Sequence, residues 1–364
     1  MQLSRVGLAF VTAAAGWLGC QLAYAAEVEQ VYPGYRWQEV GNGIFVHGAD
    51  DPLAGPVDGN SVVIINDSDV VVVDTHINPA AARAVIGKIR DLTDKPVSTI
   101  VNTHWHDDHT NGNHAYREAF PEAKIVAHRA TLAALRKEWP AMEEQRKTAY
   151  AALEPDQLIA AADKLDDEAK AISYRVYAGY IAALKPELPT MELVYPDTVF
   201  EQELVLSTGK RRIVAEWLGR GNTEGDIVVW LPDDSVLITG DLLVSPIPFA
   251  FDSPMVAWTE TLGSLQAKQA KTIIPGHGDI MRDDAYLARV SALLKTTVAA
   301  VRKAQQYEVP YENLADAVDL STFENDFTGG DAEKTFAWNA YFVSPGLKSA
   351  WVSLGFDVPE PESP

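Results

Sequence analysis

Residues 104–109 read His104-Trp105-His106-Asp107-Asp108-His109, and the other elements of the chain can be placed relative to this stretch. It follows a short β-branched run, residues 99–101, and precedes a helical pattern, so it lies at a strand-to-helix turn. In such a turn His104 and His106 can point to one side, while Asp108 and His109 face a second point nearby. Imidazole and carboxylate groups are good zinc ligands, and two such points can serve two metal ions. The stretch therefore predicts a metal-binding loop.

Short apolar runs rich in β-branched residues alternate with helical patterns on both sides of this loop. The predicted strands comprise residues 44–46, 61–65, 70–73, 99–101 and 125–127 in the first half, and 193–200, 203–206, 212–217, 227–231 and 236–239 in the second. Between strands, residues 79–90 predict an amphipathic helix. Two groups of strands with interspersed helices favour a layered sheet core that is covered by helices on the outside.

Further acidic and histidine residues stand at the ends of apolar runs. Asp74 follows residues 70–73, Asp241 follows the strand at 236–239, and His277 follows residues 272–274 in a Pro-Gly-His-Gly turn. A single aspartate at a strand end is more often a turn residue than a ligand. Together with residues 104–109, and in this order, they predict one site at a sheet edge. His114 and His128 are interpreted as structural residues.

Composition excludes several classes of protein. The chain has 364 residues, of which 47% are hydrophobic, so it can bury a sizeable core of one large or two ordinary domains. Its 51 acidic and 30 basic side chains give a net charge of −21. Such a surface repels a phosphate backbone, because nucleic-acid affinity comes mainly from Lys and Arg that neutralise phosphates. We therefore expect no nucleic-acid partner.

Residues 1–25 have the pattern of a secretory signal peptide. Arg5 gives a basic start, residues 6–22 are apolar, and Ala23-Tyr24-Ala25 matches a small-residue cleavage site. We expect a secreted or periplasmic protein whose only membrane contact is this segment. An uncleaved anchor and a lipoprotein that carries its lipid on Cys20 are the alternatives. Cleavage after Ala25 would remove Cys20, the only cysteine, and exclude disulfides and zinc thiolates from the mature chain.

Two stretches interrupt the alternation of strands and helices. Residues 129–189 are dominated by strong helix formers and predict a helical insertion. Pro140 and Pro155 are expected to separate its helices. Residues 286–364 predict a helical C-terminal extension that ends in a Pro- and Glu-rich tail. Residues 35–285, which contain the predicted strands, are expected to form one domain between the N-terminal segment and this extension.

Over residues 35–285 the sequence resembles the metallo-β-lactamase superfamily, with five motifs in family order. The resemblance implies an α/β fold, the αβ/βα sandwich, with a dinuclear metal site at one edge. It also implies roles for single residues. Asp74 matches a carboxylate that supports the metal loop, and Asp241 looks like the bridging carboxylate. In family order, the ligands of the first metal are His104 and His106, and those of the second metal are Asp108, His109 and His277.

The third motif departs from the family. Residues 219–226 resemble the Gly-His-Thr-x-Gly-Asp turn, yet Asn222 stands at the histidine position. An amide oxygen is a poorer zinc ligand than imidazole, although it suits Mn(II) or Fe(II). The protein could bind one metal ion, at the second site, or two metal ions with Asn222 as a weak ligand of the first. The first site could also fill only when the substrate contributes an oxygen ligand. As a fourth alternative, His76 could replace the missing imidazole. Our hypothesis is a tight second site and a weak or empty first site.

The resemblance implies a secreted metal-dependent hydrolase that attacks a small ester, lactone or amide (β-lactam-like) carbonyl with metal-bound hydroxide. The expected cofactor is zinc, one or two ions per chain, with Mn or Fe as alternatives, and the catalytic residues are Asp108 and Asn222. An aromatic segment, residues 242–258, is predicted to wall an apolar pocket, and Arg220 could pair with a substrate carboxylate. A phosphodiesterase or sulfatase, or a catalytically impaired metal-binding relative, is the alternative. The sequence leaves the oligomeric state open.

Overall fold

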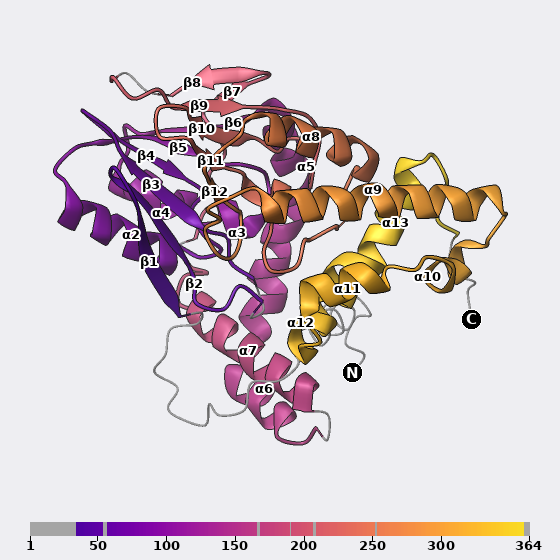
Figure 1. Ribbon diagram of the computed structural model, residues 1–364. Coiled ribbons are helices and arrows are strands. Elements are labelled where there is room, and N and C mark those ends of the chain that lie inside the picture. The colour runs from indigo at the N-terminus through magenta and orange to yellow at the C-terminus, as the bar shows by residue number, and fades with distance from the viewer. Residues whose placement is uncertain are drawn as a thin grey trace.

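In the computed structural model two β-sheets lie face to face, and helices cover both outer faces (Figure 1). The structure describes residues 34–359 except 54–56, 166–167, 190, 207–208 and 252. The predicted signal peptide, residues 1–25 with Cys20, and the last residues of the C-terminal tail lie outside the described residues. Within the described part of the chain, every helix is too short or too polar to cross a bilayer.

The first sheet has seven strands in chain order. They are β1 (Tyr35–Gly41), β2 (Ile44–Ala49), β3 (Ser61–Ile65), β4 (Val70–Val73), β5 (Val97–Val101), β6 (Lys124–His128) and β7 (Thr198–Phe200). The first four pair antiparallel, whereas β4 to β7 pair parallel. The carboxyl ends of β4, β5 and β6 therefore meet at one edge of this sheet.

The second sheet has five strands in the order β12-β11-β10-β9-β8. They are β8 (Glu203–Val205), β9 (Val214–Glu216), β10 (Val228–Leu231), β11 (Val236–Ile238) and β12 (Thr272–Ile274). Strands β11 and β12 pair parallel, with Ile238 opposite Ile274. Their carboxyl ends therefore also meet at one edge, and each leads into a short loop.

Two apolar clusters lie on the two faces of the first sheet. Val71 and Val73 of β4 face the second sheet, where they join a cluster with Val229 and Ile238. Val70 and Val72 face the other way and pack against the covering helices. Because β4 is buried on both faces, its sequence is a continuous apolar run rather than an alternating one.

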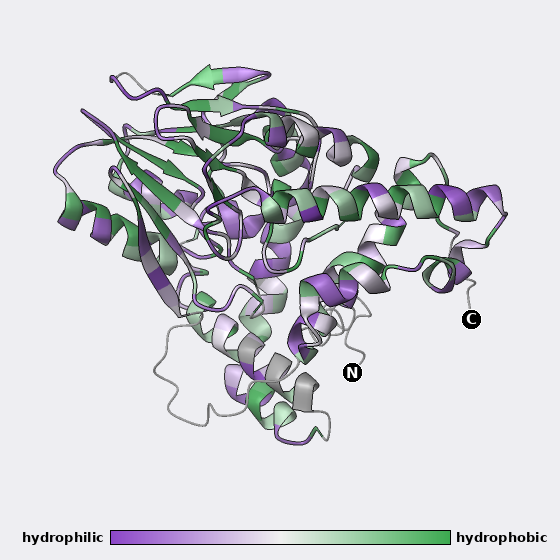
Figure 2. Cartoon of the chain, viewed as in Figure 1, coloured by the Kyte–Doolittle hydropathy of each residue, from purple (hydrophilic) through white to green (hydrophobic). Residues whose placement is uncertain are grey.

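Helices close the outer faces of both sheets. The first sheet is covered by α2 (Pro79–Leu92) and α4 (Asn113–Ala119), and the second by α8 (Met255–Ala267) and α9 (Ala285–Gln306). Figure 2 shows green and purple residues alternating along α2, whose buried residues include Val85 and Ile89. The N-terminus of α2 is capped by Asn78, whose side-chain oxygen accepts from the Ala81 N–H at 2.9 Å. This arrangement is the expected αβ/βα sandwich.

The remaining helices occupy the stretches that interrupt the sandwich. The insertion contains α5 (Arg129–Gln145), a π-helical turn η1 (Arg146–Tyr150), α6 (Pro155–Ala162) and α7 (Glu168–Leu184). Short helices α3 (Asp107–Thr110) and η2 (Gly240–Leu242) follow β5 and β11. The C-terminal segment contains η3 (Tyr311–Asn313), α10 (Leu314–Ala317), α11 (Ser321–Thr328), α12 (Ala332–Ala337), η4 (Trp338–Val343) and α13 (Ser344–Ser353). It packs against α8 and α9 in one core cluster.

The structure differs from the sequence-based expectation in three elements. The sequence pattern does not predict strand β1, because it is a half-buried edge strand with polar residues along both faces. The strand expected over residues 193–200 is only Thr198–Phe200, since Pro196 cannot donate to a strand ladder. Pro140 does not interrupt its helix: α5 continues through it, with Leu135 and Trp139 fully buried on the turn before.

Candidate metal centre

The loops that follow four strands converge at one edge of the sandwich. Asp74 follows β4, residues 104–109 follow β5, Asp241 lies in η2 after β11, and His277 follows β12. Parallel pairing brings β4 beside β5 and β11 beside β12, so both pairs end at the same edge. Backbone hydrogen bonds tie the loops together: the Thr75 N–H donates to the His109 carbonyl, and the Asn60 N–H donates to the Gly276 carbonyl.

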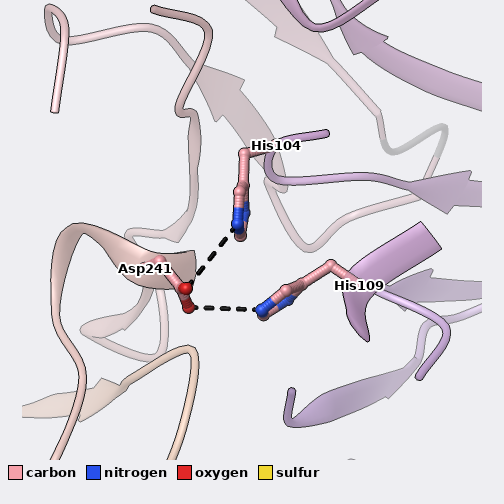
Figure 3. Close-up of side chains that lie close together, drawn as sticks. All are labelled: His104, His109 and Asp241. Atoms are coloured by element: carbon pink, nitrogen blue, oxygen red, sulfur yellow. Dashed lines mark ion pairs between the residues drawn. The ribbon is translucent and has the colours of Figure 1, made fainter. Parts of the chain in front are cut away.

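Two overlapping groups of side chains could hold metal ions. Figure 3 shows the rings of His104 and His109 pointing toward the Asp241 carboxylate. Their Nε2 atoms lie 3.6 and 3.2 Å from its Oδ2 and Oδ1 atoms, respectively. The second group comprises Asp108, His109 and His277, with Asp108 Oδ2 at 3.3 and 3.0 Å from the two Nε2 atoms. His109 belongs to both groups.

The donor set fits a cation. His104 Nε2 and Asp241 Oδ1 are buried, and neither has a hydrogen-bond partner among the described residues. Buried polar atoms without partners cost free energy, whereas a metal ion bound among them would satisfy nitrogen and oxygen at once. His109 Nε2 and His277 Nε2 lie only 3.2 Å apart, again directed at a common point. Imidazole and carboxylate together suit zinc and other first-row divalent metals.

Charge coupling within the site changes the titration of its members. Burial alone would lower the pKa of His277, but Asp241 and Asp108 raise it to about 9. Burial likewise opposes the charge of Asp108, yet His109 and His277 hold the pKa of that carboxyl well below its usual range. The carboxylates thus favour the protonated forms of His277 and of His109, whose pKa they also raise, whereas burial lowers the pKa of His104 and His106. A metal ion must displace these protons, so its affinity falls at low pH.

Asp74 orients His109. Its Oδ2 accepts from His109 Nδ1 at 2.8 Å and from the Thr103 hydroxyl at 2.7 Å, while Oδ1 accepts from the Thr103 N–H at 2.8 Å. Because a carboxylate only accepts, Nδ1 of His109 must carry the proton, which leaves Nε2 free to face the site. Asp74 holds a positive φ of 59°, so the chain turns sharply to bring it there.

Replacing Asp74 with Asn should weaken metal binding by about 10–100-fold, the usual effect of losing a partner behind a ligating histidine. The amide can donate, so it no longer selects the Nδ1–H form of His109. Competition titration against a chromogenic chelator would measure this change. Asp69→Asn is the matched control, because Asp69 is a buried aspartate at the opposite end of the same strand. Equal affinities for the two variants would contradict the role of Asp74.

The remaining predicted site residues lie beside these two groups. The His106 ring lies against that of His104, with 4.6 Å between ring centroids. Asn222 is 2% exposed, and its Nδ2 lies 3.4 Å from Asp241 Oδ2. Arg220 is half exposed, and its Nη1 lies 3.3 Å from Glu224 Oε1, so its nearest charged partner is this glutamate.

His76 does not replace the missing imidazole, because both of its ring nitrogens have other partners. Its Nδ1 donates to Asp58 Oδ2 at 3.1 Å, and its Nε2 accepts from His47 Nδ1 at 2.8 Å. The Asp58 carboxylate is also bound by the Tyr35 hydroxyl and by the Ile77 N–H. Sequence reasoning does not reveal this buried Asp58–His76–His47 chain, since no local pattern links its three members.

The Asp58–His76–His47 chain should make the fold sensitive to acid. Burial, assisted by His76, lowers the pKa of His47 from 6.5 to about 3. The unfolded chain therefore binds more protons than the folded one between these values, so stability is lost as pH falls below 6.5. From pH 7.5 to 4.5 the wild type should lose about 3 kcal/mol more unfolding free energy than His47→Gln. Urea unfolding would measure this, with His114→Gln as control; parallel curves for wild type and His47→Gln would refute it.

Arg146 is another residue beside the site that sequence patterns do not reveal. It begins η1 in the helical insertion and is 4% exposed. Its Nη2 donates to Asn111 Oδ1 at 2.9 Å and lies 3.5 Å from Asp107 Oδ2. The insertion is thereby anchored to the metal loop itself.

Aromatic residues after Asp241 lie against the site on one side. The Phe249 ring is 5.2 Å from that of His277 and 5.0 Å from that of Tyr341 in η4. Phe251 is partly exposed, whereas Ile247 and Trp258 are fully buried in the core. Only part of the predicted aromatic wall therefore lies beside the histidines. The other histidines expected to be structural lie elsewhere: His128 caps α5, and His114 lies 3.6 Å from Glu118.

The fold and this cluster define a metal-dependent hydrolase of the αβ/βα class. A family model described as the metallo-beta-lactamase superfamily matches residues 54–277, more than half of the chain. The chain belongs to this superfamily, as its motifs indicated.

Curated relatives include both lactamases and a sulfatase. The chain is 25% identical over 231 residues to a metallo-beta-lactamase type 2 of Bacteroides fragilis, covering 62% of this chain and 71% of the relative. It is 25% identical over 241 residues to a linear primary-alkylsulfatase of a Pseudomonas species, covering 64% of this chain but only 44% of that protein. A match to the metallo-beta-lactamase IND-1 of Chryseobacterium indologenes, 30% identical, covers 25% of this chain and 43% of that protein.

Solved structures confirm the fold. A metallo-beta-lactamase from Pontibacter korlensis superposes with a TM-score of 0.53 at 18% identity, covering 72% of this chain and 99% of that structure. The metallo-beta-lactamase DIM-1 exposed to ceftazidime superposes with a TM-score of 0.52 at 21% identity, covering 74% and 99%. Both superpositions cover nearly all of the solved structure, whereas about a quarter of this chain has no counterpart in either one.

Proposed function

We propose that this protein hydrolyses a small ester, lactone or amide, including β-lactam-like substrates, at a carbonyl carbon. The observation that carries the proposal is the convergence of two groups, His104, His109 and Asp241, and Asp108, His109 and His277. Within them, His104 Nε2 and Asp241 Oδ1 are buried without a hydrogen-bond partner among the described residues. In the reaction the bond from the carbonyl carbon to the leaving oxygen or nitrogen breaks, water supplies hydroxide to the carbon, and its proton ends on the leaving atom.

The ligands divide into a tight and a weak set. Asp108, His109 and His277, with Asp241, form the proposed tight site, because their donor atoms lie closest together. His104 and His106, with Asp241, form the proposed weak site, since Asn222 stands where a third imidazole would be needed. Zinc is the proposed metal, one or two ions per chain, and Mn or Fe remains the alternative.

The chain's own groups would then position the reactants. A bound metal ion would lower the pKa of water to about 7 and so supply a nucleophile near neutral pH. Asp108, 7% exposed, would accept a hydrogen bond from the attacking water and hold it in place. The Asn222 amide carries two N–H groups, of which one faces Asp241. The other would donate to the substrate oxygen as charge develops there.

The surroundings favour a weakly charged substrate. Phe249 gives the site an apolar side next to His277, and ligand sites are mostly apolar with a few polar groups. Arg220 has Glu224 as a partner, and Arg146 contacts Asn111 and Asp107. Neither arrangement resembles a cluster that would recognise a phosphate group.

A sulfatase or phosphodiesterase activity is the second candidate, supported by the similarity to the linear primary-alkylsulfatase. A metal-binding relative with impaired catalysis is the third, supported by Asn222 at the histidine position. The zinc-, manganese- and iron-loaded protein should be assayed with nitrocefin, a lactone, a linear alkyl sulfate and bis-p-nitrophenyl phosphate. Turnover of nitrocefin or the lactone that disappears with a chelator would support the first candidate. Turnover that survives chelation would contradict every metal-hydrolase assignment.

Secretion to the periplasm is proposed on the signal-peptide pattern of residues 1–25. The N-terminal sequence of the mature protein tests it: cleavage after Ala25 supports the proposal, whereas an intact Arg5 segment contradicts it.

A further inference from the structure

The orientation of the Asn222 amide follows from the chemistry of its neighbours. One end of the amide lies 3.4 Å from Asp241 Oδ2, and the other lies 3.3 Å from the Ser253 hydroxyl. An ionised carboxylate has no proton to donate, so the amide atom that faces Asp241 must be nitrogen. The amide oxygen then faces the Ser253 hydroxyl, for which it is an acceptor at 3.3 Å beside the Phe251 carbonyl at 3.4 Å. In this orientation the oxygen is turned away from Asp241 and from the metal ligands around it.

Ser253 is itself held by the C-terminal segment. Its backbone N–H donates to the Ser349 hydroxyl at 3.1 Å, and that hydroxyl donates to the Ala250 carbonyl at 2.9 Å. The Ala250 N–H donates to the Tyr341 carbonyl at 2.9 Å. Ser253 and Ser349 are 2% and 3% exposed, so water cannot easily replace these bonds. The loop beside Asn222 is thus bound to η4 through Ala250 and to α13 through Ala250 and Ser253.

We propose that Ser253, held by Ser349 of the C-terminal extension, is a positioning residue that fixes Asn222 as a hydrogen-bond donor and withholds its oxygen from the metals. The inference builds on the proposed function, because it explains why Asn222 does not substitute for the missing imidazole as a ligand. The family match ends at residue 277. The C-terminal extension is therefore more than a cover for the second sheet: it is a part of the site.

The direct test uses the metal-free full-length protein with ¹⁵N-labelled asparagine. Hydrogen exchange of the Asn222 side-chain amide is followed by NMR, with its signal identified by its absence in Asn222→Ala. Ser253→Ala should speed this exchange about 5–10-fold, the factor that one buried hydrogen bond is worth. Ser349→Ala should act in the same direction but less, because it acts through Ser253. Ser253→Thr keeps the hydroxyl and should restore the wild-type rate.

Ser264→Ala is the matched control, because Ser264 lies on α8 and its hydroxyl donates to the Glu260 carbonyl of the same helix. The backbone N–H of Ser253 is retained in Ser253→Ala, so its bond to Ser349 persists and a thermal melt near that of the wild type is expected. The inference would be overturned if Ser253→Ala exchanged at the wild-type rate. It would also be overturned if Ser264→Ala accelerated the exchange as much as Ser253→Ala does.

A second measurement separates this inference from the proposed function. With one zinc ion bound, Mn(II) should bind Ser253→Ala about fivefold more tightly than wild type, because the released amide oxygen can turn toward a hard ion. Adding Asn222→Ala should abolish the gain. An unchanged Mn(II) affinity with normal zinc binding contradicts the inference alone. A chain that binds no metal contradicts the proposed function, while the exchange experiment still decides the orientation of Asn222.

Discussion

Replacing His109 with Gln should lower hydrolysis by at least about 10³-fold and remove tightly held metal from the protein. His109 is the imidazole common to both candidate ligand groups, and its Nε2 lies within 3.3 Å of both Asp108 and Asp241. Without it, both candidate groups lose a nitrogen atom, and the buried carboxylates of Asp108 and Asp241 each lose one of their imidazole partners. A metal ion supplies several kcal/mol of charge stabilisation in the transition state, which corresponds to this loss of rate.

Metal content after dialysis and turnover should be measured together for His109→Gln. Because the substitution also removes the bond to Asp74, a thermal melt is needed to show that the variant is folded. His114→Gln is the matched control: it changes a buried histidine of the following helix that belongs to neither ligand group. A folded His109→Gln protein that retains its metal and stays within about tenfold of wild-type turnover would refute the assignment.

Replacing Asn222 with His should raise the amount of tightly bound zinc from one to two ions per chain, as expected for a complete three-histidine site. The new imidazole would join His104 and His106, and His104 Nε2 is already buried without a hydrogen-bond partner among the described residues. The gain arises because imidazole binds zinc much better than an amide does.

Zinc per chain after exhaustive dialysis measures this effect, and Asn222→Gln is the control that keeps an amide at the position. Because Asn222 is buried, a melting curve should confirm that the larger ring is accommodated. Two tightly held zinc ions in the wild type, or an unchanged stoichiometry in Asn222→His, would contradict the weak-site hypothesis.

Much of the fold could be predicted because its signals are local. Continuous valine runs such as residues 70–73 identify strands that are buried on both faces, and the amphipathic pattern of residues 79–90 identifies α2. The edge strand β1 could not be predicted in this way, because only its pairing with β2 stabilises a polar, half-buried sequence.

The candidate site, like the fold, could be predicted where its signals are local. His104, Asp108 and His109 are neighbours in the chain, and their spacing alone indicates metal binding. Asp241 and His277 could be added from their positions at the ends of apolar runs, and the resemblance to a known family then assigned their roles. The roles of these residues as ligands stay predictions until metal binding is measured.

By itself the sequence determined the alternation of strands and helices and the ligand-like pattern of residues 104–109, because each is recorded in residues close together in the chain. The αβ/βα sandwich and the significance of Asn222 came from the resemblance to a known family. Only the tertiary structure decided how the Asn222 amide is oriented and which residues bind the two ring nitrogens of His76. It also decided how the C-terminal extension reaches the site. Ser253 and Ser349 are 96 positions apart, and their contact is made only when α13 packs on the second half of the sandwich. Such hydrogen bonds form only where segments far apart in the chain pack against each other. The spacing of residues along the chain does not indicate which segments do so.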